Sequence, residues 1–231
     1  MIKRTTGSTA SVDRHLRREI LSGRLRPGDR VPTERELATA LGVSRASVHH
    51  AIAALATQGL LAPRRRTGTI VNDLREHGSL DVLRDVFAVT RPKEATALVA
   101  GVLELRRLLG GEAVAIACAR RTEGDLAAFA AAVEKLRRAS DRRAIVGAEA
   151  ALFACITTAT HNLAFALTVS SLRRFWIAHA ELEKSSPFSH AELVAHYEKL
   201  FGLLVARRSE AAKKHTLAQL TIADRHVLAS L

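Results

Sequence analysis

Residues 32–71 constrain the fold more than any other part of the sequence. Thr33 and Glu36 have the spacing of a capping box, which predicts that a helix begins at Thr33. Gly42 is expected to end this helix, because glycine readily adopts the left-handed conformation found at helix C-termini. Ser44 then predicts the start of a second helix, whose apolar residues recur at helical spacing. A turn of only about four residues joins the two helices, as in a helix-turn-helix.

Two short apolar runs follow the second helix and flank a basic segment. Residues 60–62 and 69–71 predict a β-hairpin around residues 63–68, which contain three consecutive arginines. Arginines at a hairpin tip suit contact with phosphates, because cations there release the counterions condensed on DNA. The first turn of the second helix, residues 45–49, would be free to enter a major groove. This part of the chain therefore predicts a DNA-binding winged helix-turn-helix.

The charge distribution agrees with a nucleic-acid partner. The formal net charge is +12, and residues 1–74 hold 13 Lys and Arg against 6 Asp and Glu, whereas residues 75–231 hold 22 against 17. The basic excess is denser around the motif, as expected of a DNA-binding surface. A basic membrane-surface protein is the competing interpretation, but no predicted helix has the one-sided basic amphipathicity that it would need. The start of the chain lacks an apolar signal core, and polar residues interrupt the most apolar stretch, so we predict a cytoplasmic protein that does not enter membranes.

A polar segment without periodicity predicts a boundary between a DNA-binding domain, residues 1–75, and a second domain, residues 76–231. Beyond it no strand-like alternation occurs, and the sequence indicates long helices rich in Ala and Leu. The predicted helices are 79–89, 92–120, 123–139, 142–160, 163–184, 189–206 and 209–231. Gly110 and Gly111 lower the helix propensity of the second of these and predict a bend. The predicted fold class is mostly α, a winged helix-turn-helix with a small β-hairpin wing followed by an all-α helical bundle.

The N-terminal motif closely resembles a known family. Residues 16–48 read L-R-R-E-I-L-S-G-R-L-R-P-G-D-R-V-P-T-E-R-E-L-A-T-A-L-G-V-S-R-A-S-V and are followed by G-L-L and G-T-I-V. This pattern resembles the winged helix-turn-helix of GntR-family transcription regulators over roughly residues 12–71. The resemblance implies base and phosphate contacts from the two helices and the wing. The predicted DNA-binding residues are Thr33, Arg35, Ser44, Arg45, Ser47, His49, Arg65 and Gly68.

One departure from the family pattern falls within the second helix. GntR regulators usually have Arg-Glu where this chain has His49 and His50, and that arginine commonly reads a guanine. An imidazole is shorter than a guanidinium and cannot present its bidentate fork. The resemblance therefore implies DNA binding without implying the usual operator sequence of the family.

The second domain resembles, more diffusely, the ligand-sensing domain of the FadR branch of GntR regulators. The resemblance rests on E-L-R at residues 104–106 and on H-N-L at residues 161–163. Many members of this branch hold a divalent metal ion with one Asp and three His. At the corresponding spacing this chain has Glu149, Phe153, Tyr197 and Gln219. Because phenylalanine has no donor atom, and phenol and amide groups replace imidazole poorly, we expect no metal centre and no cofactor.

Members of the branch that hold no metal include regulators that bind long-chain acyl-CoA. The resemblance implies an effector pocket lined by Arg106, Phe153, Trp176 and Tyr197, in which Arg106 would meet a carbonyl or a carboxylate. Aromatic residues at helical spacing are more often core residues than ligand contacts. An acyl-CoA and a smaller organic acid both remain candidate effectors. Arg107 is expected at the surface.

The predicted function is a DNA-binding transcriptional regulator, a repressor or alternatively an activator, controlled by a small metabolite. One winged helix reads only a half-site, so we expect a homodimer on a pseudo-palindromic site in double-stranded DNA. An enzyme is not expected, because nucleophile elbow, phosphate-loop and metalloprotease motifs are all missing. Two alternatives are retained, a metal-responsive GntR regulator that uses His196 and His215, and an architectural DNA-binding protein without a ligand.

Overall fold

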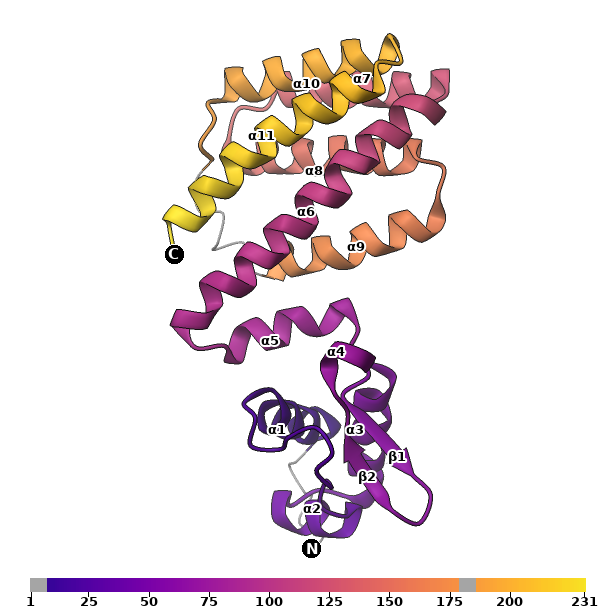
Figure 1. Cartoon of the computed structure of the whole chain (residues 1–231), viewed down its shortest axis with the longest axis vertical. Helices are drawn as coiled ribbons and strands as arrows, with labels where there is room; N and C mark the ends of the chain where they lie inside the picture. Colours follow the sequence, from indigo (N-terminus) through magenta and orange to yellow (C-terminus); the bar gives the residue numbers. More distant parts are fainter. Residues whose placement is uncertain (1–7, 179–185) are drawn as a thin grey trace, which may run out of the picture. The chain divides into compact units, whose positions relative to one another are not determined.

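The computed structural model describes residues 8–178 and 186–231, and the chain divides into two compact units, Met1–Ala95 and Thr96–Leu231 (Figure 1). The elements of the first unit are α1 (Thr9–Leu21), α2 (Glu34–Leu41), α3 (Arg45–Thr57), β1 (Leu61–Arg64), β2 (Gly68–Val71), α4 (Leu74–His77), the 3-10 helix η1 (Leu80–Val82) and α5 (Leu83–Val89). The remaining helices are α6 (Pro92–Arg120), whose first turn belongs to the first unit, α7 (Glu123–Arg137), α8 (Arg142–Ala159), α9 (Leu163–Ala178), α10 (His190–Val205) and α11 (Ser209–Ala229). The predicted fold class is confirmed.

The core of the first unit lies between α1, α3 and the hairpin. Val12 and Leu16 of α1 are buried at helical spacing and belong to one apolar cluster with Leu55 of α3. Leu61 and Val71 face each other across the hairpin and complete this cluster. Burial of these side chains holds the two helices and the wing in one body, since apolar burial is the main driving force of folding.

The hairpin is longer in its strands and shorter in its tip than the sequence predicted. Antiparallel pairing runs from Leu61 opposite Val71 to Arg64 opposite Gly68, so residues 65–67 alone form the tip. A third extended segment also lies along β2, because the backbone N–H of Val31 donates to the carbonyl of Thr69 at 2.9 Å. This extra pairing supports the base of the wing.

Residues 76–95 belong to the first unit, whereas the sequence predicted them at the start of the second domain. Val82 is 3% exposed within the first core. Arg17 of α1 donates to Asp85 of α5 at 2.7 Å and also pairs with Asp13. These contacts attach the segment to the winged helix-turn-helix and explain the difference from the expected boundary.

The rest of α6 and helices α7–α11 form the second unit, and its core is built mainly between α7, α8 and α10. Leu136, Leu152 and Leu200, one from each of these helices, are buried. The helix bounds agree with the predicted ranges to within a few residues, except that the predicted end of the fifth range lies outside the described residues. None of the helices described in the structure combines the length and the apolar character needed to cross a bilayer.

The two adjacent glycines of α6 have a packing role within a continuous helix. A Cβ atom on Gly110 would lie 3.0 Å from a methyl group of Leu220, and one on Gly111 would lie 3.1 Å from a methyl group of Leu217. Both leucines belong to α11. The glycines therefore allow α6 and α11 to approach closely, which explains why residues of low helix propensity occur inside a long helix.

Candidate DNA-binding interface and effector site

Helices α2 and α3 both begin at hydrogen-bonded caps. The Thr33 hydroxyl accepts from the backbone N–H of Glu36, and the Glu36 carboxylate accepts from the backbone N–H of Thr33 at 2.7 Å, so the predicted capping box is present. Gly42 ends α2 with a φ of 64°. The Ser44 hydroxyl accepts from the backbone N–H of Ser47 at 3.1 Å and caps α3. The predicted DNA-binding residues Thr33, Ser44 and Ser47 therefore lie at these caps, where they set the starts of the two helices.

Helix α3 buries one side and exposes the other. Val48 is buried in the core, whereas Arg45, Ala46, His49 and His50 are exposed. Arg45 and His49 are one turn apart and project on the same side. We call these four exposed residues the recognition face.

Arg35 of α2, Arg45 of the recognition face and Arg65 of the hairpin tip are exposed. Among the residues that the structure describes, their guanidinium groups have no hydrogen bond or ion pair. A guanidinium without an internal partner keeps all of its donors for a phosphate or for the acceptor atoms of a base.

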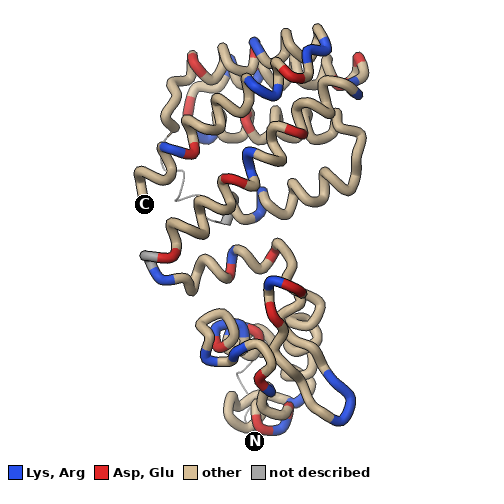
Figure 2. Tube along the Cα trace, viewed as in Figure 1, with Lys and Arg blue, Asp and Glu red and all other residues tan. Residues whose placement is uncertain are grey.

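The wing carries its charge at the turn between β1 and β2. Arg64 ends β1, Arg65 and Arg66 follow in the tip, and all three are exposed; Figure 2 shows a basic run at this end of the hairpin. Arg66 has a φ of 68° and Gly68 a φ of 90°, and these values produce the tight reversal of the chain. The hairpin thus presents three guanidinium groups on one small projection.

His49 has a partner that the sequence did not indicate. Its Nδ1 atom lies 2.8 Å from a carboxylate oxygen of Glu34, the first residue of α2. The side chain of His49 nevertheless remains 68% exposed. The pair links the two helices at the recognition face.

Among the described residues of the second unit, Asp224 of α11 is the most buried charged side chain, at 2% exposed. Its two carboxylate oxygens accept from Arg106 and from Arg107, both of α6. The guanidinium carbon of Arg106 also lies 4.9 Å from the ring centroid of Trp176, a cation–π distance. The side chain of Arg107, which was expected at the surface, is 34% exposed and pairs with Asp224.

Tyr197 of α10 joins the same interior region. Glu149 of α8 and Arg106 of α6 both interact electrostatically with its phenol. Burial raises the pKa of Tyr197 above its usual range, and Glu149 raises it further, so the phenol stays protonated. Phe153 lies one turn beyond Glu149 on the same side of α8. The structure thus brings Arg106 and Trp176 into contact and places Tyr197 within electrostatic range of Arg106, whereas no contact of Phe153 with these three side chains is seen among the described residues.

The residues at the four metal-ligand positions of the FadR branch do not fit a divalent ion. Phe153 offers no donor, and Tyr197 is a phenol that burial keeps protonated. In the described ranges, moreover, no group of three or more His, Cys, Asp and Glu side chains is placed to hold a metal ion.

His196 gives the second unit a predictable pH dependence. Burial lowers its pKa to about 4, and the neighbouring His215, stacked at 4.5 Å between ring centroids, lowers it as well. The folded state therefore binds fewer protons than the unfolded state. Its stability is complete above the ordinary histidine pKa of about 6.5 and is lost as the pH falls toward 4, by about 3 kcal/mol.

Chemical denaturation of the wild type and of His196→Leu at several pH values between 7 and 4 checks this expectation. The variant should lose much less stability over that range, because leucine fills a similar volume without a titratable group. Equal losses in the two proteins would contradict the assignment to His196.

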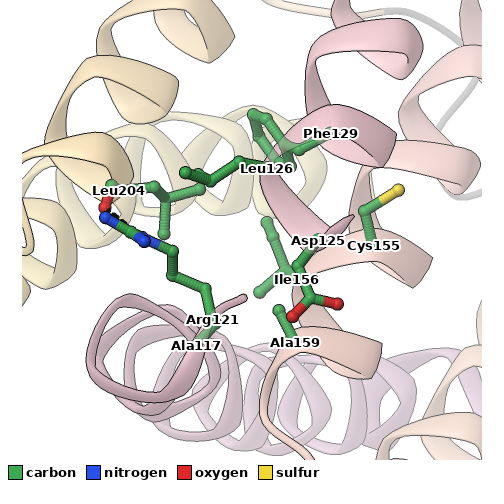
Figure 3. A pocket seen from close by; sticks show the side chains of 9 residues that line it. All are labelled: Ala117, Arg121, Asp125, Leu126, Phe129, Cys155, Ile156, Ala159 and Leu204. Atoms are coloured by element: carbon green, nitrogen blue, oxygen red, sulfur yellow. Dashed lines mark hydrogen bonds between the residues drawn. The ribbon is translucent and has the colours of Figure 1, made fainter. Parts of the chain in front are cut away.

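A small cavity opens between α6, α7, α8 and α10, with a volume of about 10 Å³ (Figure 3). A cavity of this volume holds about one water molecule and is far too small for a metabolite. Arg121 crosses one side and donates to the backbone carbonyls of Leu204 and Val205 at 3.0 and 2.7 Å. Burial and the nearby Asp125 raise the pKa of the Cys155 thiol, which makes it a poor nucleophile. We therefore interpret this cavity as a small void left by helix packing and not as an effector site.

Comparison with known proteins matches both units. The model of bacterial regulatory proteins of the gntR family matches residues 8–71, and the FCD domain model matches residues 101–221. An uncharacterized HTH-type transcriptional regulator of Mycobacterium tuberculosis is 34% identical over 169 residues, which cover 70% of this chain and 63% of that protein. The HTH-type transcriptional regulator Mce2R of Mycobacterium tuberculosis is 37% identical over 109 residues, 47% of this chain and 45% of Mce2R. The match thus spans less than two thirds of the length of these relatives.

Among solved structures, Lar, which controls the expression of the Listeria monocytogenes agr system, has a TM-score of 0.57 at 21% identity over 97% of this chain and 99% of its own. This likeness supports the fold. The matched family and relatives are transcriptional regulators, which confirms the prediction that the chain is not an enzyme. A winged helix-turn-helix followed by a helical FCD unit, each matched by its own model, shows that this chain belongs to the GntR family of bacterial regulatory proteins.

Proposed function

We propose that this chain is a transcriptional repressor of the FadR branch that binds double-stranded DNA as a homodimer and responds to a small organic acid. The observation that carries the DNA-binding part is the exposure of Arg35, Arg45 and Arg65 without internal partners among the described residues. Their two helices and wing are the elements that contact the major groove and the backbone in winged helix-turn-helix proteins. A two-fold dimer would place two recognition faces on the halves of a pseudo-palindromic operator.

Arg45→Gln is expected to weaken operator binding by about tenfold or more, because it removes a guanidinium placed to contact a base or phosphate. Fluorescence anisotropy with a selected operator, repeated over a range of salt concentrations, measures the effect. The matched control is Arg143→Gln, which removes the same charge from an exposed position on α8. Equal affinities for the two variants would argue against a contact by Arg45.

The effector proposal rests on the contact of a guanidinium with an indole inside the helical unit, with the phenol of Tyr197 within electrostatic range of that guanidinium. The Trp176 ring lies under Arg106, and its buried Nε1 donor has no hydrogen-bond partner among the described residues. Such atoms commonly bond to water or to a ligand. A carboxylate offers acceptors to both groups, and a guanidinium binds it with two parallel hydrogen bonds. A small acid is favoured over an acyl-CoA, since it displaces fewer packed side chains.

The effector would act by binding one arrangement of the dimer more tightly than another, because a ligand with equal affinity for both shifts nothing. Native mass spectrometry of the purified full-length chain, compared with its denatured mass, tests the proposal. A dimer that carries a co-purified organic acid supports it. A retained metal ion would favour a metal-responsive regulator instead. An empty dimer whose operator affinity is unchanged by mono-, di- and tricarboxylic acids would favour an architectural protein.

A further inference from the structure

The contact between Glu34 and His49 fixes which ring nitrogen of the histidine faces away from the protein. The carboxylate oxygen of Glu34 lies 2.8 Å from Nδ1 of His49. An ionised carboxylate only accepts hydrogen bonds, so the hydrogen of this contact must be carried by Nδ1. The other nitrogen, Nε2, is then the atom that the exposed ring offers to a partner. In a neutral imidazole with its proton on Nδ1, Nε2 is an acceptor.

Whether Nε2 donates or accepts a hydrogen bond determines which bases it can contact. In the major groove, cytosine N4 and adenine N6 are amino donors, whereas guanine presents only the acceptors N7 and O6. An arginine in place of His49 would only donate and would therefore select guanine. An acceptor at the same place selects an amino group. His49 lies on the recognition face, one turn after Arg45, where a base edge is within reach of a docked helix.

We propose that Glu34 is a positioning residue that makes His49 read the amino group of a cytosine or an adenine in each half-site. The inference rests on the proposed DNA-binding function. It assigns a specificity role to Glu34, which contacts no base itself in this scheme. The ring of His50, 6.1 Å away between centroids, and Arg45 are the other titratable or charged groups of the recognition face beside His49. Neither of them replaces the carboxylate as an acceptor for Nδ1.

Selection from a random DNA library by the full-length protein, followed by sequencing, tests the inference. A buffer near pH 8 is used, because imidazole side chains are ordinarily neutral there. The wild type should enrich cytosine or adenine over guanine at one position of each half-site by about threefold to tenfold. His49→Ala should abolish the preference at that position alone. Glu34→Gln should weaken it at the same position, because an amide can donate to Nδ1 as well as accept from it and no longer fixes the tautomer.

The double variant of Glu34→Gln with His49→Ala separates positioning from a structural effect. It should give the base profile of His49→Ala alone, because Glu34 acts through the imidazole. Glu76→Gln is the matched control, since it removes the same charge from an exposed residue of α4 in the same unit. Thermal unfolding midpoints close to the wild-type value show that the variants are folded.

Three results would overturn the inference. Guanine enriched at the position that depends on His49 would show that Nε2 donates. An unchanged profile for Glu34→Gln would show that Glu34 has no part in specificity, while DNA binding would stand. A wild-type protein that enriches no sequence at all would instead remove the proposed function, and the inference with it.

Discussion

Gly59→Ala is expected to destabilise the winged-helix unit strongly while leaving the stability of the helical unit unchanged. Gly59 has a φ of 80°, a conformation that side chains with a Cβ rarely adopt. A Cβ at this position would also lie 1.7 Å from the backbone carbonyl oxygen of His77, far inside contact distance. Because the obstructing atom belongs to the backbone of α4, no side-chain rotation relieves the overlap. Strain and displacement together should cost about 3 kcal/mol or more.

Gly23→Ala is the matched control for this substitution. Gly23 also has a positive φ, of 74°, but a Cβ there meets no atom within 4 Å. The free energy of unfolding of Gly23→Ala should therefore fall by only about 1–2 kcal/mol, which is the cost of the backbone conformation alone. Comparison of the two variants separates backbone strain from steric exclusion.

The two units can be followed separately during unfolding. Trp176 is the single tryptophan of the chain and lies in the second unit, so its fluorescence reports that unit. Circular dichroism reports both units. For Gly59→Ala we expect an early loss of helical signal and of operator binding, with a fluorescence transition close to that of the wild type. A Gly59→Ala protein as stable as Gly23→Ala would contradict the close approach of Gly59 to α4.

Asp224→Asn is expected to destabilise the helical unit by about 3 kcal/mol, the scale observed when one partner of a buried ion pair is removed. Asp224 is 2% exposed and is the shared counter-ion of Arg106 and Arg107. The amide retains the shape of the side chain but cannot neutralise two guanidinium groups. Because Arg106 lies over the Trp176 ring, the fluorescence of the folded protein should change as well.

Glu112→Gln provides the matched control, because it also removes a carboxylate that links α6 to α11. Glu112 pairs with Lys213, but the side chains are 52% and 32% exposed. An exposed pair of this kind contributes at most about 1 kcal/mol. Chemical denaturation monitored by tryptophan fluorescence should therefore give Asp224→Asn a much lower free energy of unfolding than Glu112→Gln. The same stability for both variants would show that burial of Asp224 has little energetic weight.

Asp224 also bears on the proposed effector. An organic acid that binds Arg106 must compete with this internal carboxylate, and its binding would loosen the link between α6 and α11. The affinity for the effector would depend on the difference between two interaction free energies, that of Arg106 with the effector carboxylate and that of Arg106 with Asp224.

The local features of this chain were predictable from its sequence. Thr122 and Ser189 stand three residues before Asp125 and Glu192, as Thr33 stands before Glu36, and all three capping boxes are present at helix starts. These signals are readable because the donor and the acceptor are three residues apart and apolar periodicity is a property of one helix. The winged helix-turn-helix was recognisable for the same reason, since its parts follow one another within a short stretch.

The contacts that decide the chemistry of the candidate sites come only from tertiary structure. Glu34 reaches His49 across 15 positions, and Arg106 reaches Asp224 across 118. Packing of helices sets which side chains meet across such separations, and the pattern of a single helix does not contain that information. A lone acidic residue among the apolar positions near the end of α11 was the one signal for Asp224. The sequence by itself determined the elements and the DNA-binding motif, whereas the fold decided the polarity of His49, the partner of Arg106 and the close approach at Gly59, because each depends on two elements that meet in space.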